Sequence, residues 1–140
     1  MANVILVGVD DSDSSRRAAR KAAELAVSLG AELHVVSAVD NAAVEEIPDR
    51  PGASLLTSGE VGEAIATEVA DQLVDLVPGV VSNLVYGKPA TALVEEAERL
   101  EAGLIVVGNR RVQGVGRILG SVASSVAAHA PCDVYIVKTV

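Results

Sequence analysis

Five short apolar runs alternate with four stretches of helical pattern, and this alternation restricts the fold more than any other feature. The runs are Val4–Val9, Leu33–Val39, Val80–Tyr86, Leu104–Gly108 and Val134–Val137. Most are rich in Val and Ile, and several lack polar alternation, which is typical of strands covered on both faces. Strands that alternate with helices predict parallel strands joined by right-handed crossovers. We therefore expect an α/β fold over residues 1–140, a single doubly wound, Rossmann-like sheet of five parallel strands in the order 3-2-1-4-5 with helices on both faces.

The first two helical stretches have clear boundary signals. Ser12 is a suitable N-cap for the first helix, and Gly30 is a suitable residue just past its end. The second helix follows Thr57-Ser58-Gly59-Glu60, which can form a capping box, and Pro78-Gly79 is expected to end it. The residues expected to face the core at helical spacing are Ala18, Ala19, Ala22, Ala26 and Leu29 in the first helix, and Val61, Ile65, Val69, Leu73 and Leu76 in the second.

The last two helices begin at a proline and at a glycine. Pro89 suits the first position of the third helix, Gly120-Ser121 opens the fourth, and Pro131 closes it. The residues expected to face the core are Ala90, Leu93, Val94, Ala97 and Leu100 in the third helix, and Val122, Ala123, Val126 and Ala127 in the fourth. The segment from Asp40 to Ser58 fits neither pattern, and both a functional loop and a surface connector stay open for it.

Composition excludes several classes of protein. Half of the 140 residues are apolar, yet there is no Phe or Trp, and the formal charge is -8. Few aromatic side chains are available to stack on bases, and an acidic surface repels the phosphate backbone, so we do not expect binding to nucleic acids. Cys132 is the single cysteine, which fits a reducing compartment. The N-terminal segment has the pattern of a strand rather than of a signal peptide. No stretch reaches the roughly 20 apolar residues of a membrane span. We therefore expect a cytoplasmic protein with no membrane partner.

Two segments after predicted strands could bind a ligand. Asp10 and Asp11 follow the first strand, where a carboxylate can accept hydrogen bonds from ribose hydroxyls, hold a cation, or simply cap a helix. The stretch from Val107 to Ser121 contains four glycines and ends at a helix N-terminus, which favours phosphate. Arg110, Arg111 and Arg117 add local positive charge to this otherwise acidic chain. The stretch matches neither the P-loop nor the dinucleotide pattern.

These segments, together with two others, resemble the universal stress protein family over essentially the full length. The similar motifs are Val7-Gly8-Val9-Asp10-x-Ser12, Gly87-Lys88-Pro89-Ala90, Leu104–Gly108 followed by Leu119-Gly120-Ser121-Val122, and Ala130-Pro131-Cys132-Asp133-Val134. The resemblance implies a stress-response regulatory protein that binds ATP or another adenine nucleotide, with Mg²⁺ as a companion ion. It also implies a homodimer, usually formed through the last strand, here Val134–Val140.

The resemblance assigns a role to several positions. Val9 and Asp10 border the adenosine, with Asp10 near the ribose; Val39 offers its backbone to adenine; and Gly108 passes close to the ribose. The backbone amides of Gly120, Ser121 and Val122, together with the Ser121 hydroxyl, hold phosphate. Two neighbouring residues and three arginines complete the set of nucleotide-binding candidates. The full set is Val9, Asp10, Val39, Val107, Gly108, Arg110, Arg111, Arg117, Gly120, Ser121, Val122 and Ala123.

The chain departs from the family signature at one point. The family has G-x-x-G, then nine residues, then G-[S/T]; here Arg111 stands at the second glycine and eight residues separate it from Gly120. ATP, AMP, a cyclic nucleotide and an interaction module without nucleotide therefore all stay open. A phosphoacceptor receiver is disfavoured because Tyr86-Gly87-Lys88-Pro89 replaces the acceptor aspartate. No catalytic or metal-ligating group is expected, and His34, His129 and Cys132 are interpreted as structural.

Overall fold

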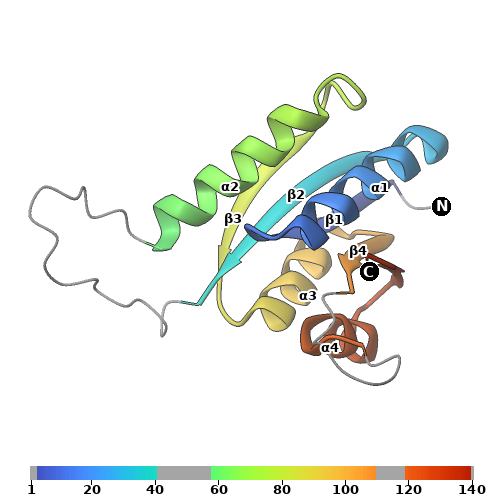
Figure 1. Ribbon diagram of the computed structural model, residues 1–140. Helices are drawn as coiled ribbons and strands as arrows, with labels where there is room; N and C mark the ends of the chain where they lie inside the picture. Colours follow the sequence, from blue (N-terminus) through green and yellow to red (C-terminus); the bar gives the residue numbers. More distant parts are fainter. Residues whose placement is uncertain (1–2, 41–57, 110–118, 140) are drawn as a thin grey trace, which may run out of the picture.

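The computed structural model describes residues 3–40, 58–109 and 119–139. Its elements, in chain order, are β1 (Val4–Val9), α1 (Asp13–Leu29), β2 (Glu32–Val39), α2 (Ser58–Leu73), β3 (Val81–Tyr86), α3 (Pro89–Leu100), β4 (Leu104–Gly108), α4 (Ser121–His129) and β5 (Asp133–Val137). All strand pairs are parallel, and the sheet has the order β3-β2-β1-β4-β5 (Figure 1). The predicted fold class and strand order are confirmed.

Two helices cover each face of the sheet. Figure 1 shows α1 and α2 on one side and α3 and α4 on the other. The side chains of β1 alternate between the two layers: Ile5 packs in the core under α1 and α2, whereas Leu6 packs in the core under α3 and α4. Both cores consist of aliphatic residues, which the absence of Phe and Trp from the sequence required. The non-alternating apolar strands thus follow from burial on both faces.

Helix α1 has the predicted ends. Ser12 is its N-cap, and Gly30 follows it in the left-handed region with φ of 63°. Its buried apolar residues are all alanines, namely Ala18, Ala19, Ala22, Ala23 and Ala26. Such small side chains let the helix lie close to the sheet. Leu29, which we expected to face the core, is instead 50% exposed, because the helix ends there and the chain turns away at Gly30.

The predicted face of α2 is wrong at both ends. Val61 and Leu76 are 42% and 43% exposed, and the helix ends at Leu73 rather than near Pro78. A strict four-residue spacing drifts by about 40° per step around a helix of 3.6 residues per turn, so Val61 lies off the face that Val69 and Leu73 share. Gly62 lies on that face instead, where an added Cβ would come within 2.6 Å of the Val39 side chain.

Helix α4 is buried over a narrower face than predicted. Ala123 and Val126 are in the core, but Ala127 is exposed and Val122 is 37% exposed. In α3 the expected residues Leu93, Val94 and Ala97 are buried. None of the helices in the described ranges is long and apolar enough to cross a membrane.

Candidate functional site

A cavity of about 200 Å³ lies at the carboxyl ends of β1 and β4. These two strands are neighbours, but the chain leaves β1 for one edge of the sheet and β4 for the other, and ligands of doubly wound folds bind at this switch point. Val36, Leu93 and Val107 form apolar walls, and serines after β1 form a polar rim. The lining residues are Gly8, Val9, Asp10, Ser12, Ser14, Ser15, Val36, Ala38, Pro89, Leu93, Val107, Gly108 and Val122.

The turn after β1 fixes Asp10 at the rim of this cavity. The Ser12 backbone N–H donates to Asp10 Oδ1 at 2.8 Å. The Asp10 N–H donates to Ser15 Oγ at 3.0 Å, and the Ser15 hydroxyl donates to the Asp10 carbonyl at 2.8 Å. The carboxylate is thereby held in one orientation at the entrance, where it can accept hydrogen bonds from a ligand's hydroxyl groups.

The N-terminus of α1, which borders the cavity, is capped by its own residue. Ser12 Oγ accepts a hydrogen bond from the Ser15 N–H at 3.1 Å. A side-chain acceptor of this kind satisfies one of the amides that a helix start leaves without a backbone partner. The positive end of α1 is therefore partly neutralised from within the protein.

The N-terminus of α4 borders the same cavity and has no such cap. Its N-cap is Gly120, with φ of -59° and ψ of 157°, and no described side chain makes a capping hydrogen bond. The Gly120 N–H donates to Asn109 Oδ1 at 2.9 Å, so the first amides of the helix itself are those of Ser121, Val122 and Ala123. Uncapped amides at a helix start bind anions, because both the N–H groups and the helix dipole favour negative charge.

Gly108 lets α1 and β4 come together beside the cavity. A Cβ added here would lie 2.7 Å from Ser14 Oγ and 2.9 Å from the Ser14 carbonyl oxygen. No side chain fits at these distances without moving the backbone of α1. The glycine is thus required by the close packing of the two elements that form one wall of the site.

The structure brings most of the predicted site residues together. Five of the twelve candidates line the cavity: Val9, Asp10, Val107, Gly108 and Val122. Gly120, Ser121 and Ala123 lie at the start of α4, next to Val122. Arg110, Arg111 and Arg117 lie outside the described residues.

Val39 is the predicted site residue that the structure places apart from the cavity. Its side chain lies toward Gly62 on α2, and its carbonyl already accepts the Gly87 N–H at 2.8 Å. Val36 and Ala38 line the cavity on the other face of the same strand. The predicted contact of the Val39 backbone with adenine stays a prediction.

Sequence reasoning missed Ser14, Asn109 and Leu93 as site residues. Leu93 was assigned only to the core, although it also forms a cavity wall. Asn109 directly follows Gly108 at the end of a buried strand, and a carboxamide at that position is a signal that could have identified it. Ser14 gave no signal, because its role depends on contacts with Thr139, far away in the sequence.

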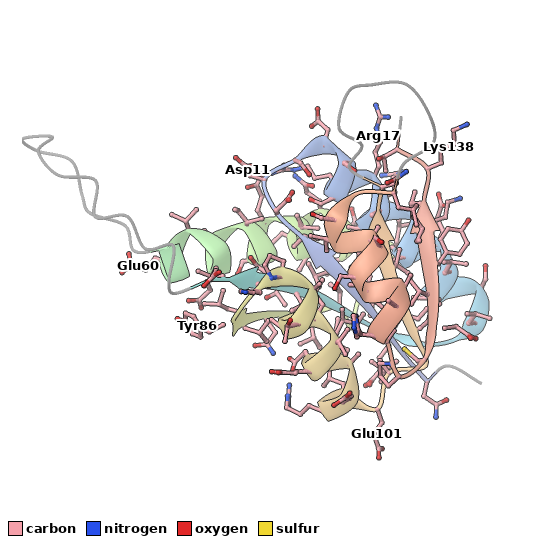
Figure 2. The ribbon with its side chains drawn as sticks, turned by 90° about the horizontal axis from the view of Figure 1, so that it is seen from below. Asp11, Arg17, Glu60, Tyr86, Glu101 and Lys138 are labelled. Carbon is pink, nitrogen blue, oxygen red and sulfur yellow. The ribbon has the colours of Figure 1, made fainter. Side chains whose placement is uncertain are left out.

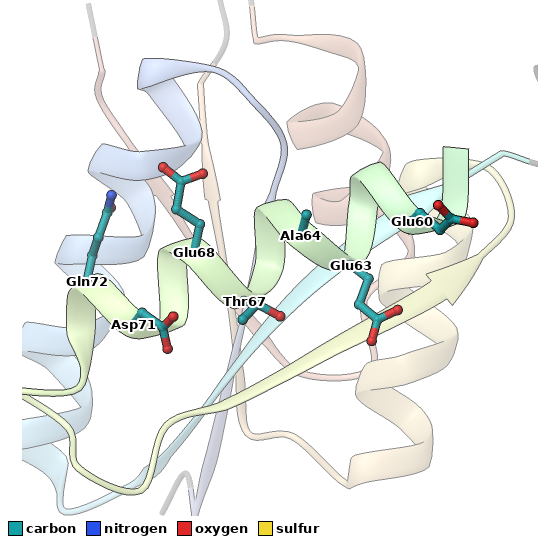
Figure 3. Close-up of a pocket in the computed structure, with 7 residues that line it drawn as sticks. All are labelled: Glu60, Glu63, Ala64, Thr67, Glu68, Asp71 and Gln72. Carbon is teal, nitrogen blue, oxygen red and sulfur yellow. The ribbon is translucent and has the colours of Figure 1, made fainter. Parts of the chain in front are cut away.

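A second, larger hollow of about 670 Å³ lies on the outer surface of α2 (Figure 3). All seven of its lining residues belong to this one helix, and Glu60, Glu63, Glu68 and Asp71 are acidic. Figure 3 shows Glu63 and Glu68 pointing to different sides of the helix rather than toward a common centre. Because an acidic surface repels phosphate, we assign no nucleotide to this hollow.

A buried carboxylate ties α3 to β3 away from the cavity. Glu96 is only 4% exposed and accepts hydrogen bonds from Asn83 Nδ2 and from Arg99 Nε and Nη2, the last at 2.9 Å. The Arg99 hydrogen bonds lower the pKa of Glu96, and they outweigh the opposing effect of burial. All of its described hydrogen-bond partners belong to α3 and β3, so we interpret its role as structural.

The remaining titratable candidates contact neighbouring residues of the fold. His34 Nε2 lies 3.9 Å from a Glu32 carboxylate oxygen, and His129 Nδ1 lies 2.9 Å from the Ser125 carbonyl one helical turn earlier. Burial and the neighbouring Asp133 raise the pKa of the Cys132 thiol, which disfavours a reactive thiolate. The described residues contain no group of three His, Cys, Asp or Glu side chains suited to a metal ion.

A five-stranded, doubly wound parallel sheet with a cavity at its switch point defines this protein as an α/β domain of the kind that binds ligands at that point. Comparison with known proteins gives the family. The family model for the universal stress protein family matches residues 1–138, and the chain belongs to this family.

Relatives and solved structures agree over nearly the whole chain. A universal stress protein of Thermus aquaticus is 35% identical over 144 residues, covering 99% of this chain and 100% of the relative. Universal stress protein Rv1636 of Mycobacterium tuberculosis is 33% identical over 144 residues, covering 96% and 95%. A crystal structure of a universal stress protein in complex with cAMP is 33% identical, with a TM-score of 0.77 and 99% of each chain covered.

Proposed function

We propose that this protein binds an adenine nucleotide at the switch-point cavity and acts as a nucleotide-responsive stress protein. The observation that carries the proposal is the uncapped start of α4 beside a cavity with apolar walls. The related protein crystallised with cAMP supports it, since it shares the fold over 99% of both chains. The start of α3 reaches the same cavity through Pro89 and also has no side-chain cap among the described residues, but the proline at its first position has no N–H to donate.

The proposed placement follows from the chemistry of each wall. The nucleoside enters the cavity between Val36, Leu93 and Val107, and its ribose hydroxyls donate to Asp10. Ligand sites for drug-sized molecules commonly measure about 300–1,000 Å³, so a cavity of about 200 Å³ suits the nucleoside rather than a complete nucleotide. The phosphate then lies outside it, on the amides of Ser121, Val122 and Ala123.

We propose ATP, AMP or a cyclic nucleotide as the ligand, with Mg²⁺ as companion to ATP. ATP is a candidate because of the family resemblance, and AMP and a cyclic nucleotide are added because the chain departs from the family signature at Arg111. In the proposed pose, the described part of the site contacts one phosphate group and a nucleoside, which all three ligands share. Titration with each of them therefore decides between the candidates.

We propose binding rather than catalysis as the activity. Among the cavity-lining residues that the structure describes, Asp10 is the one ionisable side chain, and its carboxylate takes part in the turn after β1. General acid–base chemistry at a phosphate needs a proton acceptor within hydrogen-bond reach of the reacting group. Asp10 lies at the ribose end of the proposed pose, so it is not placed for that task.

We also propose a homodimer formed through the β5 edge, in the cytoplasm. β5 lies at the edge of the sheet, and Tyr135 on this strand is 40% exposed. An exposed edge strand with apolar side chains invites pairing with a second strand. Sedimentation of the wild-type protein and of Tyr135→Lys tests this, and a monomer in both samples contradicts it.

One spectrum and one titration series test the proposed function. With no Trp and two Tyr, the protein absorbs little at 280 nm, so a co-purified adenine nucleotide dominates the ultraviolet spectrum near 260 nm. Calorimetric titration of nucleotide-free protein with ATP, AMP, cAMP and adenosine then gives the affinities. Folded protein that binds none of the four contradicts the proposal and favours the alternative, an interaction module without nucleotide.

A further inference from the structure

Asn109, the residue after β4, connects the start of α4 to the C-terminal segment. Its side-chain Oδ1 accepts the Gly120 N–H at 2.9 Å, across eleven positions of sequence. Its backbone N–H donates to the Val137 carbonyl at 2.9 Å, and its own carbonyl accepts the Thr139 hydroxyl at 3.0 Å. Three hydrogen bonds, to two segments distant in the sequence, therefore fix this one half-buried residue.

The C-terminal side of this arrangement is itself anchored. Thr139 is 8% exposed, and its Oγ1 lies 2.7 Å from Ser14 Oγ. Because the single Thr139 hydroxyl hydrogen goes to the Asn109 carbonyl, the Ser14 hydroxyl donates in this contact. Arg17 Nη1 donates to the Thr139 carbonyl at 3.0 Å, and Figure 2 shows Arg17 at the same end of the molecule as Lys138. Hydrogen bonds from α1 to the C-terminal segment, and between that segment and Asn109, therefore hold Asn109 in place.

The side chain of Asn109 also decides which amides a ligand can use. It occupies the N–H of Gly120, the residue that we expected from the sequence to hold phosphate with its amide. The amides of Ser121, Val122 and Ala123 remain at the helix start, where no described side chain caps them. A hydrogen bond at the N-cap also fixes where the helix begins, and so where these three N–H groups lie.

We propose that Asn109 is a positioning residue for the anion: its carboxamide holds Gly120 so that the first three amides of α4 converge on a phosphate group. The inference rests on the proposed function, because it assumes that the anion belongs to a nucleotide. It extends that function by naming a residue that does not need to touch the ligand and yet sets the strength of its phosphate contact.

The phosphate contribution to affinity is the quantity to measure. It is the ratio of the dissociation constant of adenosine to that of AMP, determined by calorimetry on the full chain. A misplaced set of charge-assisted hydrogen bonds lowers the ratio by about tenfold or more, so we expect that loss in Asn109→Ala. Adenosine affinity should change by less than about twofold, since the cavity walls are unaltered.

Asn83→Ala is the matched control. Asn83 also donates or accepts through a side-chain carboxamide in the body of the fold, and it bonds to Glu96 on α3 rather than to α4. Asn83→Ala should lower the free energy of unfolding while leaving the ratio of the adenosine and AMP dissociation constants unchanged. An equal loss of phosphate ratio in both variants means that general destabilisation causes the effect, which overturns the proposal.

Hydrogen exchange of the Gly120 amide in ligand-free protein gives an independent test. The amide should exchange slowly in wild type and in Asn109→Asp, which keeps the acceptor oxygen, and faster in Asn109→Ala. Equal exchange in all three overturns the proposal, as does an Asn109→Ala variant that weakens adenosine and AMP by the same factor. A wild type that binds neither ligand refutes the proposed function instead, and the exchange measurement separates this failure from that of the Asn109 contact.

Discussion

The helix starts of α1 and α4 border the same cavity but are built differently. At α1, Ser12 is the N-cap and its side chain accepts the Ser15 N–H. At α4, Gly120 is the N-cap and contributes no side chain. Each of these helices is the next element after a strand that ends at the switch point, so their places in the topology alone do not distinguish them.

The difference shows how a fold assigns separate tasks to equivalent helix ends. A capped helix start contributes to stability, because its amides are satisfied in the protein by itself. An uncapped start at a cavity keeps those amides for a ligand, and with glycine as the N-cap the fold gives up only about a few tenths of a kcal/mol of stability. In this protein we infer that α1 secures the site and α4 binds the anion.

The largest expected effect comes from giving α4 the cap that α1 has. Gly120→Asp places a carboxylate where the phosphate is proposed to bind. This carboxylate accepts hydrogen bonds from the first amides of α4 and repels the negatively charged ligand. AMP affinity should fall by about 100-fold or more, while the free energy of unfolding rises by a few tenths of a kcal/mol. Calorimetric titration and denaturant unfolding measure the two quantities.

Gly120→Ala separates the effect of the cap from that of added bulk. It adds a Cβ without an acceptor, and a φ of -59° is open to alanine. AMP affinity should fall far less than in Gly120→Asp. Equal losses in the two variants contradict the interpretation that the acceptor competes with phosphate.

The next effect concerns the close approach of α1 to β4. Gly108→Ala places a Cβ 2.7 Å from Ser14 Oγ and 2.9 Å from the Ser14 carbonyl oxygen, and it should destabilise the protein by about 1–3 kcal/mol. Gly79→Ala is the control, since nothing lies within 4 Å of its added Cβ. A Gly108→Ala variant as stable as Gly79→Ala would show that α1 does not pack against β4 as described.

A smaller effect compares the two helix ends directly. Ser12→Ala removes the cap of α1 and should cost about 1 kcal/mol of unfolding free energy. Ser121→Ala, in the first turn of α4, removes an exposed hydroxyl and should cost less than about 0.5 kcal/mol. Denaturant unfolding of both variants measures this, and equal costs would remove the contrast on which the comparison depends.

The smallest effect is a pH dependence that should be independent of both helix ends. The pKa of Glu96 is lowered in the folded protein, chiefly by Arg99, so its ion pair contributes stability above the unfolded-state pKa. That contribution is lost as the pH falls through the folded-state pKa, and Glu96→Gln should flatten the acid limb of stability. The free energy of unfolding is measured between pH 3 and 6, with and without AMP. The part of its pH dependence that Glu96→Gln removes should be the same in both conditions. A part that AMP alters would show that Glu96 is coupled to the nucleotide site.

The fold was predictable because its signals are local and repeated. Runs such as Val4–Val9 specify buried strands, and Ser12 and Gly30 mark the ends of α1, so element order and topology follow from the chain itself. The inward face of α2 was predicted less well, because the close contact of Gly62 with Val39 depends on tertiary packing that no helical periodicity reveals.

The candidate site was predictable where a single segment carries it. Asp10, Gly108 and the start of α4 lie in motifs that can be recognised without a structure. Asn109 carried a signal in its place after a buried strand, although its contact with Thr139 spans 30 positions. Ser14 could not be identified in this way, since its contact with Thr139 spans 125 positions. The Val39 side chain lies toward Gly62 on α2, on the other face of β2 from the cavity, while the predicted contact of its backbone with adenine stays a prediction.

Backbone amide spectra of labelled protein during titration with adenosine and with AMP test the central claim most directly. If the uncapped start of α4 binds phosphate, AMP shifts the Ser121, Val122 and Ala123 amides strongly, adenosine does not, and the Ser15 amide of capped α1 moves little with either. If AMP and adenosine shift these amides equally, or if Ser15 responds to the phosphate instead, the assignment of the anion to α4 is wrong.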